Sequence, residues 1–418
     1  MVSAPQARLA PSRDRLYELV KPVLPAYLVS RSVVLAVAIL LQWLLDTGRA
    51  NAYGYIGKAP LSTLTALFDA NWYASITTGG YQVSAPLDQQ TNIHFMPLYP
   101  FLMRVAGMLL GLGEVVGGYN IAGVLLSHVF FLIALVLLYK LTLEVWGDES
   151  LATRSVWLMA VFPWSFVFSL AYTESLFLML ILWALLIAWR MREEPLPWRC
   201  LALGMLLALA SLTRHHGLLM AAGAAWLVAI HPRHLSWAAR VRNALLAALP
   251  AVVVFAGFVL YIGLQTGELL AVLTAHGAWG KGYWNDLPLL LVLPPANPAW
   301  SMYVLSTIGL VALLVLTVGS MAMFYSDFKK RNSQPFSPQR VWPGAWAFVW
   351  CTLPFVLYLL TSMTANQSWG RYLMSLFPCI WAAAWWLKSQ RPYTRFIQVS
   401  LVMQCVFFSA AVLLQVTP

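Results

Sequence analysis

Long apolar runs alternate with short polar stretches along almost the whole chain. An α-helix needs about 20 residues to cross the apolar core of a bilayer, and most of these runs approach that length. The runs fall at roughly 24–45, 119–142, 151–168, 173–190, 200–213, 217–231, 245–264, 301–325, 342–362, 371–388 and 394–415. The pattern predicts an all-α polytopic membrane protein with about 11 transmembrane helices, folded as a single domain over 1–418.

The stretch 67–100 breaks this pattern, because it is polar, rich in aromatic rings and interrupted by Gly and Pro. Such a segment among membrane spans is a candidate site of chemistry. A further apolar run follows at 97–112, but it is short and contains Arg104. Whether this run crosses the membrane decides the side on which every later loop lies.

The distribution of basic residues indicates that 97–112 does not cross. With a cytoplasmic N-terminus and no crossing there, all but six of the 26 Lys and Arg residues lie on the cytoplasmic side. The six on the outer side are Arg49, Lys58, Arg104, Arg214, Lys281 and Arg371. Lys and Arg accumulate in cytoplasmic loops, and a crossing would largely reverse this bias. We therefore predict a juxtamembrane helix at 97–112 and a C-terminus outside the membrane.

Composition and charge agree with a membrane protein. The chain is 61% hydrophobic and 10% charged, whereas soluble domains carry about a quarter charged residues. The net charge of +11 suggests nucleic acid at first sight, but basic cytoplasmic loops explain it, and we expect no nucleic-acid partner. The four Cys residues lie at or within apolar segments without CxxC spacing, so we expect neither disulfides nor a metal site.

This topology brings several polar turns to the outer face. They are the loop 46–118, the turns 172–175, 213–217 and 366–372, and the loop 265–300. Polar turns that converge on one side of a membrane predict a site at the water–lipid boundary.

Two carboxylates in these turns are candidates for catalysis. Asp69 could act as a general base on a hydroxyl group, although an Asp before a helix is also a common N-cap. Glu174 stands between two spans, where a carboxylate is costly and usually has a partner or a function. A capping role at the start of the span 173–190 is the alternative for Glu174.

Two cations and several rings are candidates for substrate binding. Arg214 and Arg371 present planar guanidinium groups suited to phosphate oxygens, although both could instead be cations at helix ends. His215 and His216 are adjacent, so we expect their rings to point apart and not to form a metal site. Rings that could stack on a sugar, or simply belong to an interfacial belt, are Trp72, Tyr73, Tyr99, Tyr172 and Trp369. His94, His215 and Tyr372 complete the predicted substrate site.

Five motifs together resemble the glycosyltransferase C superfamily, and more closely the PIG-V-like mannosyltransferases and their bacterial relatives. They are FDANWY (68–73), FMPLYPFLMR (95–104), FPWSFVFSLAYTESLF (162–177), SLTRHHG (211–217) and WGRYLMSLFP (369–378). They occur in the order of the family and span most of the chain up to 378. The sequence departs from the family at Phe68 and Met96, where Trp and Phe are common.

The resemblance implies an inverting transfer of a hexose, namely mannose, from a polyprenyl-phosphate donor to an acceptor hydroxyl at the outer membrane face. Asp69 matches the position of the family's base, Glu174 its acidic Tyr-Thr-Glu position, and Arg214 and Arg371 its basic positions. The implied partners are membrane lipid, the lipid-linked donor and a lipid, glycan or protein acceptor. No cofactor is implied. A lipid or sugar transporter (flippase) and a non-catalytic subunit of a membrane complex are the alternatives, and a bacterial plasma membrane is the expected location.

Overall fold

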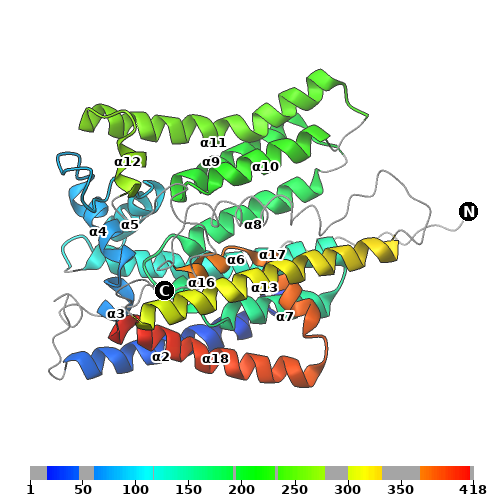
Figure 1. The fold of residues 1–418 in the computed structure, drawn as a ribbon, viewed down its shortest axis with the longest axis horizontal. Coiled ribbons are helices and arrows are strands. Elements are labelled where there is room, and N and C mark those ends of the chain that lie inside the picture. Colours follow the sequence, from blue (N-terminus) through cyan, green and yellow to red (C-terminus); the bar gives the residue numbers. More distant parts are fainter. Residues whose placement is uncertain are drawn as a thin grey trace, which may run out of the picture.

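Helices form all the regular secondary structure in the described residues, and most of them lie side by side (Figure 1). The computed structural model describes residues 17–46, 61–115, 117–191, 194–230, 234–277, 300–331 and 368–414. The longer helices are α2 (Leu24–Asp46), α6 (Gly118–Trp146), α7 (Glu149–Val161), α8 (Glu174–Arg190), α9 (Pro197–Thr213), α10 (Gly217–Ile230), α11 (Trp237–Thr266), α13 (Trp300–Arg331) and α18 (Gln390–Leu413). The shorter ones are α3 (Ser62–Thr65), α4 (Asp69–Gly79), α5 (Leu98–Leu109), η1 (Ser165–Ser169), α12 (Ala271–Gly277), α16 (Trp369–Leu373) and α17 (Phe377–Trp386).

The chain is an integral membrane protein. Within the described ranges, four helices are long and apolar enough to cross a bilayer: α2, α6, α11 and α18. Their outward side chains are largely apolar, as at Leu249, Val253 and Leu260 of α11, which suits contact with lipid. The predicted eleven spans exceed these four helices, and the predicted span 342–362 lies outside the described residues.

The helices are arranged in layers around α8. Helices α9, α10 and α11 pack together at the top of Figure 1, whereas α2 and α18 pack together at the bottom. Between them, α8 contacts α6 on one side and α9 on the other. Almost every residue of α8 is buried, because the helix is apolar on all faces and is surrounded by other helices.

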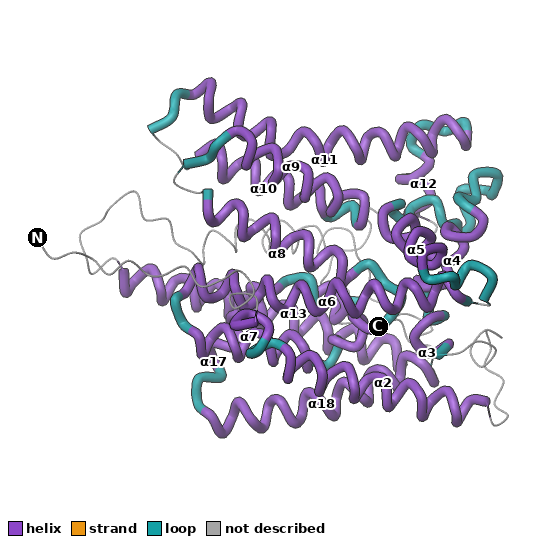
Figure 2. Tube along the Cα trace, turned by 180° about the vertical axis from the view of Figure 1, so that it is seen from behind, coloured by secondary structure: helices purple, strands orange, loops and turns teal. Residues whose placement is uncertain are grey.

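Short helices collect at one end of the molecule. Helices α3, α4, α5 and α12 lie at the left of Figure 1 and at the right of Figure 2, beyond the ends of the long helices. Helix α5 has 12 residues and is about 18 Å long, whereas a bilayer core is about 30 Å thick. It is therefore too short to span, as expected for 97–112, and its position along the membrane surface stays a prediction.

Prolines break two of the predicted spans. The run 151–168 is α-helical only as far as Val161, because Pro163 disfavours the helical conformation at Phe162. A 3₁₀ helix, η1, follows. The run 371–388 consists of α16 and then α17, which begins anew with Pro378 in its first turn. The first break and η1 precede the turn at 172–175, and the second break follows Arg371 and Tyr372 of α16.

A buried arginine holds the first of these breaks in place. Arg31 lies within α2, not in a cytoplasmic loop as the charge count assumes, and its side chain is buried. Its guanidinium donates to the carbonyl oxygens of Ala160 and Ser165, both at 3.0 Å, and to Ser169 Oγ at 2.8 Å. A buried cation is tolerated only when its donors are bonded. Arg31 therefore ties α2 to η1, immediately before the turn at 172–175.

Candidate active site

Four charged side chains meet where separate turns converge: Asp69 of α4, Glu174 of α8, Arg214 after α9 and Arg371 of α16. Arg371 donates from one terminal nitrogen to Asp69 Oδ2 at 2.6 Å, and from Nε to Glu174 Oε1. Arg214 also donates to Glu174 Oε1. The structure thus brings together all four charged residues that the sequence singles out, from positions up to 302 residues apart.

Glu174 is the centre of this group. Its side chain is fully buried, and one oxygen accepts from both arginines. Its other oxygen, Oε2, has no hydrogen-bond partner among the described residues. The N-cap residue of α8 is Thr173, so Glu174 is the first residue of the helix and its carboxylate turns toward the arginines. Two positive and two negative charges make the group neutral overall, which is a condition for burying it.

Asp69 is the most open member of the group. Its side chain is 25% exposed, whereas those of Arg214, Arg371 and Glu174 are 8%, 6% and 0% exposed. A molecule that approaches from outside therefore reaches Asp69 more easily than the carboxylate behind it.

A strained residue immediately precedes Asp69. Phe68, not Asp69, is the N-cap of α4, and its φ of 41° with ψ of −109° is rare for a bulky side chain. Such a conformation costs about 1–3 kcal/mol and tends to occur at functional sites. Asp69 follows as the first residue of α4, where the positive end of the helix dipole favours a carboxylate.

Aromatic rings face both arginines. The Cζ atom of Arg371 lies 4.3 Å from the ring centre of Tyr172, and that of Arg214 lies 5.1 Å from the ring centre of Tyr372. Cation–π contacts of this kind hold guanidinium groups while leaving some of their donors available. The hydroxyl of Tyr172 bonds to Leu67 O at 3.2 Å, which connects the turn at 172–175 to the start of α4.

Thr173 joins these elements, although sequence reasoning passed over it. Its Oγ1 accepts from Arg214 at 3.0 Å and lies 3.3 Å from the hydroxyl of Tyr73. The only local signal for it is its place in the Tyr-Thr-Glu motif. Burial, reinforced by the carboxylates of Asp69 and Glu174, raises the pKa of Tyr73. Its phenol therefore stays neutral and acts as a hydrogen-bonding group, not as a base.

The other predicted rings lie at different depths. Tyr99 is fully buried behind Tyr73, with ring centres 5.4 Å apart, and its hydroxyl bonds to Gly123 O at 2.8 Å. Trp72 stacks on Phe95 at 6.1 Å, and the ring of His94 lies 4.1 Å from the same phenyl ring. Tyr73, Trp72 and His94 thus surround one phenylalanine beside α4, whereas Tyr99 supports them from within.

The two adjacent histidines do not point apart as expected. The ring centres of His215 and His216 are 4.0 Å apart, because residues 214–216 form a turn between α9 and α10 and not a continuous helix. The ring of His216 lies 5.7 Å from that of Tyr372. No group of three or more His, Cys, Asp or Glu side chains that could hold a metal occurs within the described ranges.

We expect Gly370→Ala to displace α16, which carries Arg371. A Cβ atom at this position would overlap the buried indole of Trp164. Overpacking of this kind costs about 1–3 kcal/mol, so the variant should unfold at a lower temperature than the parent. Gly257→Ala is the matched control, since a Cβ there meets nothing within 4 Å. Equal unfolding temperatures for the parent and Gly370→Ala would contradict this packing.

The fold is similar to part of a solved structure. The chain is similar to the archaeal oligosaccharyltransferase AglB from Archaeoglobus fulgidus in complex with an inhibitory peptide and a dolichol-phosphate, with a TM-score of 0.50 and 13% identity over 91% of this chain and 56% of that chain. A structure of the Archaeoglobus fulgidus oligosaccharyltransferase in complex with Zn and sulfate has a TM-score of 0.49 and 14% identity over 90% of this chain and 53% of that chain.

Other comparisons add no closer relative. A scan against protein families and a search of curated proteins found no match to the sequence. The chain spans little more than half the length of the structures that it resembles. At this level of identity the similarity concerns the fold alone.

Proposed function

We propose that the chain is a membrane glycosyltransferase that moves a hexose from a polyprenyl-phosphate donor to an acceptor hydroxyl, with inversion. The observation that carries the proposal is the pair of arginines, Arg214 and Arg371, held by the buried Glu174 directly beside the more exposed Asp69. In this proposal the donor sugar is mannose, as the motifs imply. Asp69 is the general base that takes the proton of the acceptor hydroxyl.

The reaction needs a base on one side of the sugar and positive charge on the other. The acceptor oxygen forms a bond to the anomeric carbon while the bond from that carbon to the phosphate oxygen breaks. The hydroxyl proton passes to the carboxylate of Asp69, and the electron pair leaves with the polyprenyl phosphate. Arg214 and Arg371 stabilise the departing phosphate, since guanidinium groups bind phosphate oxygens in a bidentate manner.

The ion pair between Asp69 and Arg371 suggests how the donor prepares the base. A carboxylate bonded to Arg371 at 2.6 Å is a poor proton acceptor. A donor phosphate that engages Arg371 competes with this bond and releases Asp69 toward the acceptor. Glu174 keeps both arginines in position during the exchange, because its own ion pairs are buried and do not depend on Asp69.

Four further features belong to the proposal. The site faces the outside of a bacterial plasma membrane, the N-terminus is cytoplasmic, the fold has about 11 spans, and the acceptor is a lipid, glycan or protein. The fold supports a lipid-phosphate substrate, because AglB, which it resembles, was solved with a dolichol-phosphate. Trp72 lies in α4 with Asp69, His94 lies against the same Phe95 ring as Trp72, and both would contact the sugar or the acceptor.

A transfer assay with the purified chain tests the proposal. The protein is placed in nanodiscs with polyprenyl-phosphate-mannose, or the glucose analogue, and a bacterial membrane extract as acceptor source. We expect release of polyprenyl phosphate and a new glycoside with the opposite anomeric configuration, read by NMR. Because two arginines supply the positive charge, transfer should also persist in EDTA.

The alternative functions give different results in the same system. Movement of the labelled donor across the bilayer without a new glycosidic bond would show a transporter and overturn the proposal. Suppose that the pure chain is inactive and regains transfer only when a second subunit is added. If that subunit's own site has been inactivated by mutation, the restored transfer still takes place at Asp69 of this chain. Restored activity that survives the loss of Asp69 would place the chemistry elsewhere.

A further inference from the structure

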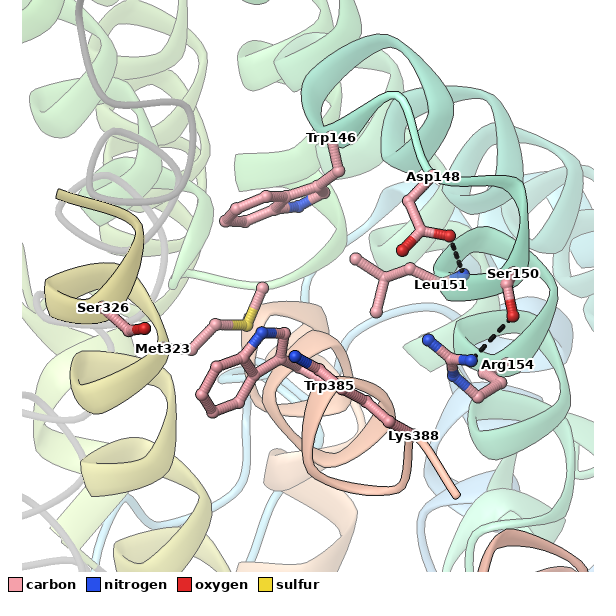
Figure 3. A pocket seen from close by; sticks show the side chains of 9 residues that line it. All are labelled: Trp146, Asp148, Ser150, Leu151, Arg154, Met323, Ser326, Trp385 and Lys388. Carbon is pink, nitrogen blue, oxygen red and sulfur yellow. Dashed lines mark hydrogen bonds between the residues drawn. The ribbon is translucent and has the colours of Figure 1, made fainter. Parts of the chain in front are cut away.

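A cavity with polar lining lies at the opposite end of the helices from the charged group at Asp69. It has a volume of about 390 Å³ and lies among the C-terminal end of α6, the N-terminal part of α7, α13 and the connection from α17 to α18 (Figure 3). None of its lining residues belongs to the motifs on which the proposed function rests. The cavity is therefore separate from the proposed site of sugar transfer.

Two basic side chains line this cavity. Arg154 donates from Nε to Ala384 O at 3.1 Å and from a terminal nitrogen to Ser150 Oγ at 2.7 Å. The Nζ atom of Lys388 lies 4.4 Å from the ring centre of Trp385. Within the described ranges, neither forms an ion pair with a carboxylate, so both retain donors for a ligand.

The acidic residue of the cavity is already hydrogen-bonded within the protein. Asp148 is the N-cap of α7, and its Oδ1 accepts from the backbone N–H of Leu151 at 2.9 Å. Figure 3 shows this bond on the side of the cavity formed by α7. With two cations and one carboxylate, the lining carries a net positive charge, which favours an anionic ligand.

The walls of the cavity favour a lipid headgroup. Trp146 and Trp385 border it from two sides, and Leu151 and Met323 add apolar surface (Figure 3). Trp is enriched at the boundary between lipid and water, and basic pockets between membrane helices on the cytoplasmic side bind anionic headgroups. The predicted topology places 143–150 and 386–391 on that side. The volume is at the lower end for small-molecule sites, enough for a headgroup and not for a whole lipid.

We propose that this cavity binds the phosphate group of an anionic phospholipid from the cytoplasmic leaflet. Arg154 and Lys388 bind the phosphate oxygens, Ser150 and Ser326 are near enough on the lining to contact the polar part of the headgroup, and the two indoles flank its glycerol end. Occupancy would connect α7 and α13 to the α17–α18 connection. The proposal is independent of the reaction at Asp69.

Lipid titration tests this site. The full chain is purified in nanodiscs of phosphatidylcholine, and phosphatidylglycerol retained by the protein is measured by native mass spectrometry as its fraction is raised. The double variant Arg154→Gln/Lys388→Gln should weaken retention about tenfold or more, equivalent to about 1.4 kcal/mol or more, since it removes the charge-assisted hydrogen bonds to the phosphate. The control Arg391→Gln/Arg395→Gln removes the same charge from exposed positions of α18.

Each outcome decides the proposal. Selective loss in the Arg154 and Lys388 variant supports it, whereas equal loss in the control shows general surface attraction and overturns it. Glycerol 3-phosphate that displaces the lipid at micromolar concentration would show a site for a soluble phosphate instead. The single variant Lys388→Gln loses only the contact with the Trp385 ring and should keep the fold. If the double variant does not fold, weaker retention of phosphatidylglycerol by this single variant supports the proposal, and parental retention overturns it.

Discussion

Asp69→Asn is expected to lower the turnover of sugar transfer about 10²- to 10⁴-fold, the usual contribution of a general base. The amide is nearly the same size and can still accept a bond from Arg371, so the fold should be kept. The KM for the donor should stay unchanged or fall, because the variant removes the carboxylate that competes with phosphate for Arg371. The measurement is initial rate against donor concentration in nanodiscs.

A matched variant separates chemistry from general charge effects. Asp88→Asn makes the same substitution in the same polar segment, 67–100, at an exposed position. It should transfer sugar at the parental rate. If Asp69→Asn remains within tenfold of the parent while Asp88→Asn is unchanged, Asp69 is not the base. A rise in the donor KM with an unchanged turnover would also contradict the role assigned to it.

Glu174→Gln is expected to be the most damaging single change to stability. It removes the buried charge that both Arg214 and Arg371 contact and leaves only Asp69 to balance two cations. Breaking a buried ion pair by removing one partner costs about 3–5 kcal/mol. The variant should unfold at a markedly lower temperature in detergent, and the surviving fraction should bind donor poorly because the arginines lose their position.

Charge compensation gives a sharper form of this prediction. The double variant Glu174→Gln/Arg214→Gln restores neutrality, so it should recover part of the lost stability but none of the activity. Glu268→Gln, an exposed carboxylate after α11, is the control and should match the parent in both. Parental stability in Glu174→Gln, or a double variant less stable than the single, would show that Glu174 does not balance the arginines.

The apolar runs alone were enough to predict much of this architecture. They predicted an all-α membrane protein, because a long apolar segment in lipid must bond its own backbone. They placed α2, α6 and α18 within a few residues, whereas α11 begins at Trp237, well before the predicted run 245–264. The two broken spans also have a local signal, since Pro163 and Pro378 stand where the helices end or begin. The number of spans does not follow from the four long helices.

The polar residues of the candidate site were also visible in the sequence, because charged side chains in short turns between apolar runs are costly and conspicuous. No local sequence pattern predicts which residues these side chains contact. Only the tertiary structure decided that Glu174 bridges Arg214 and Arg371, that Asp69 bonds to an arginine 302 residues away, and that Thr173 joins Arg214 to Tyr73. These contacts arise from packing between distant helices, which the periodicity of a single segment does not record.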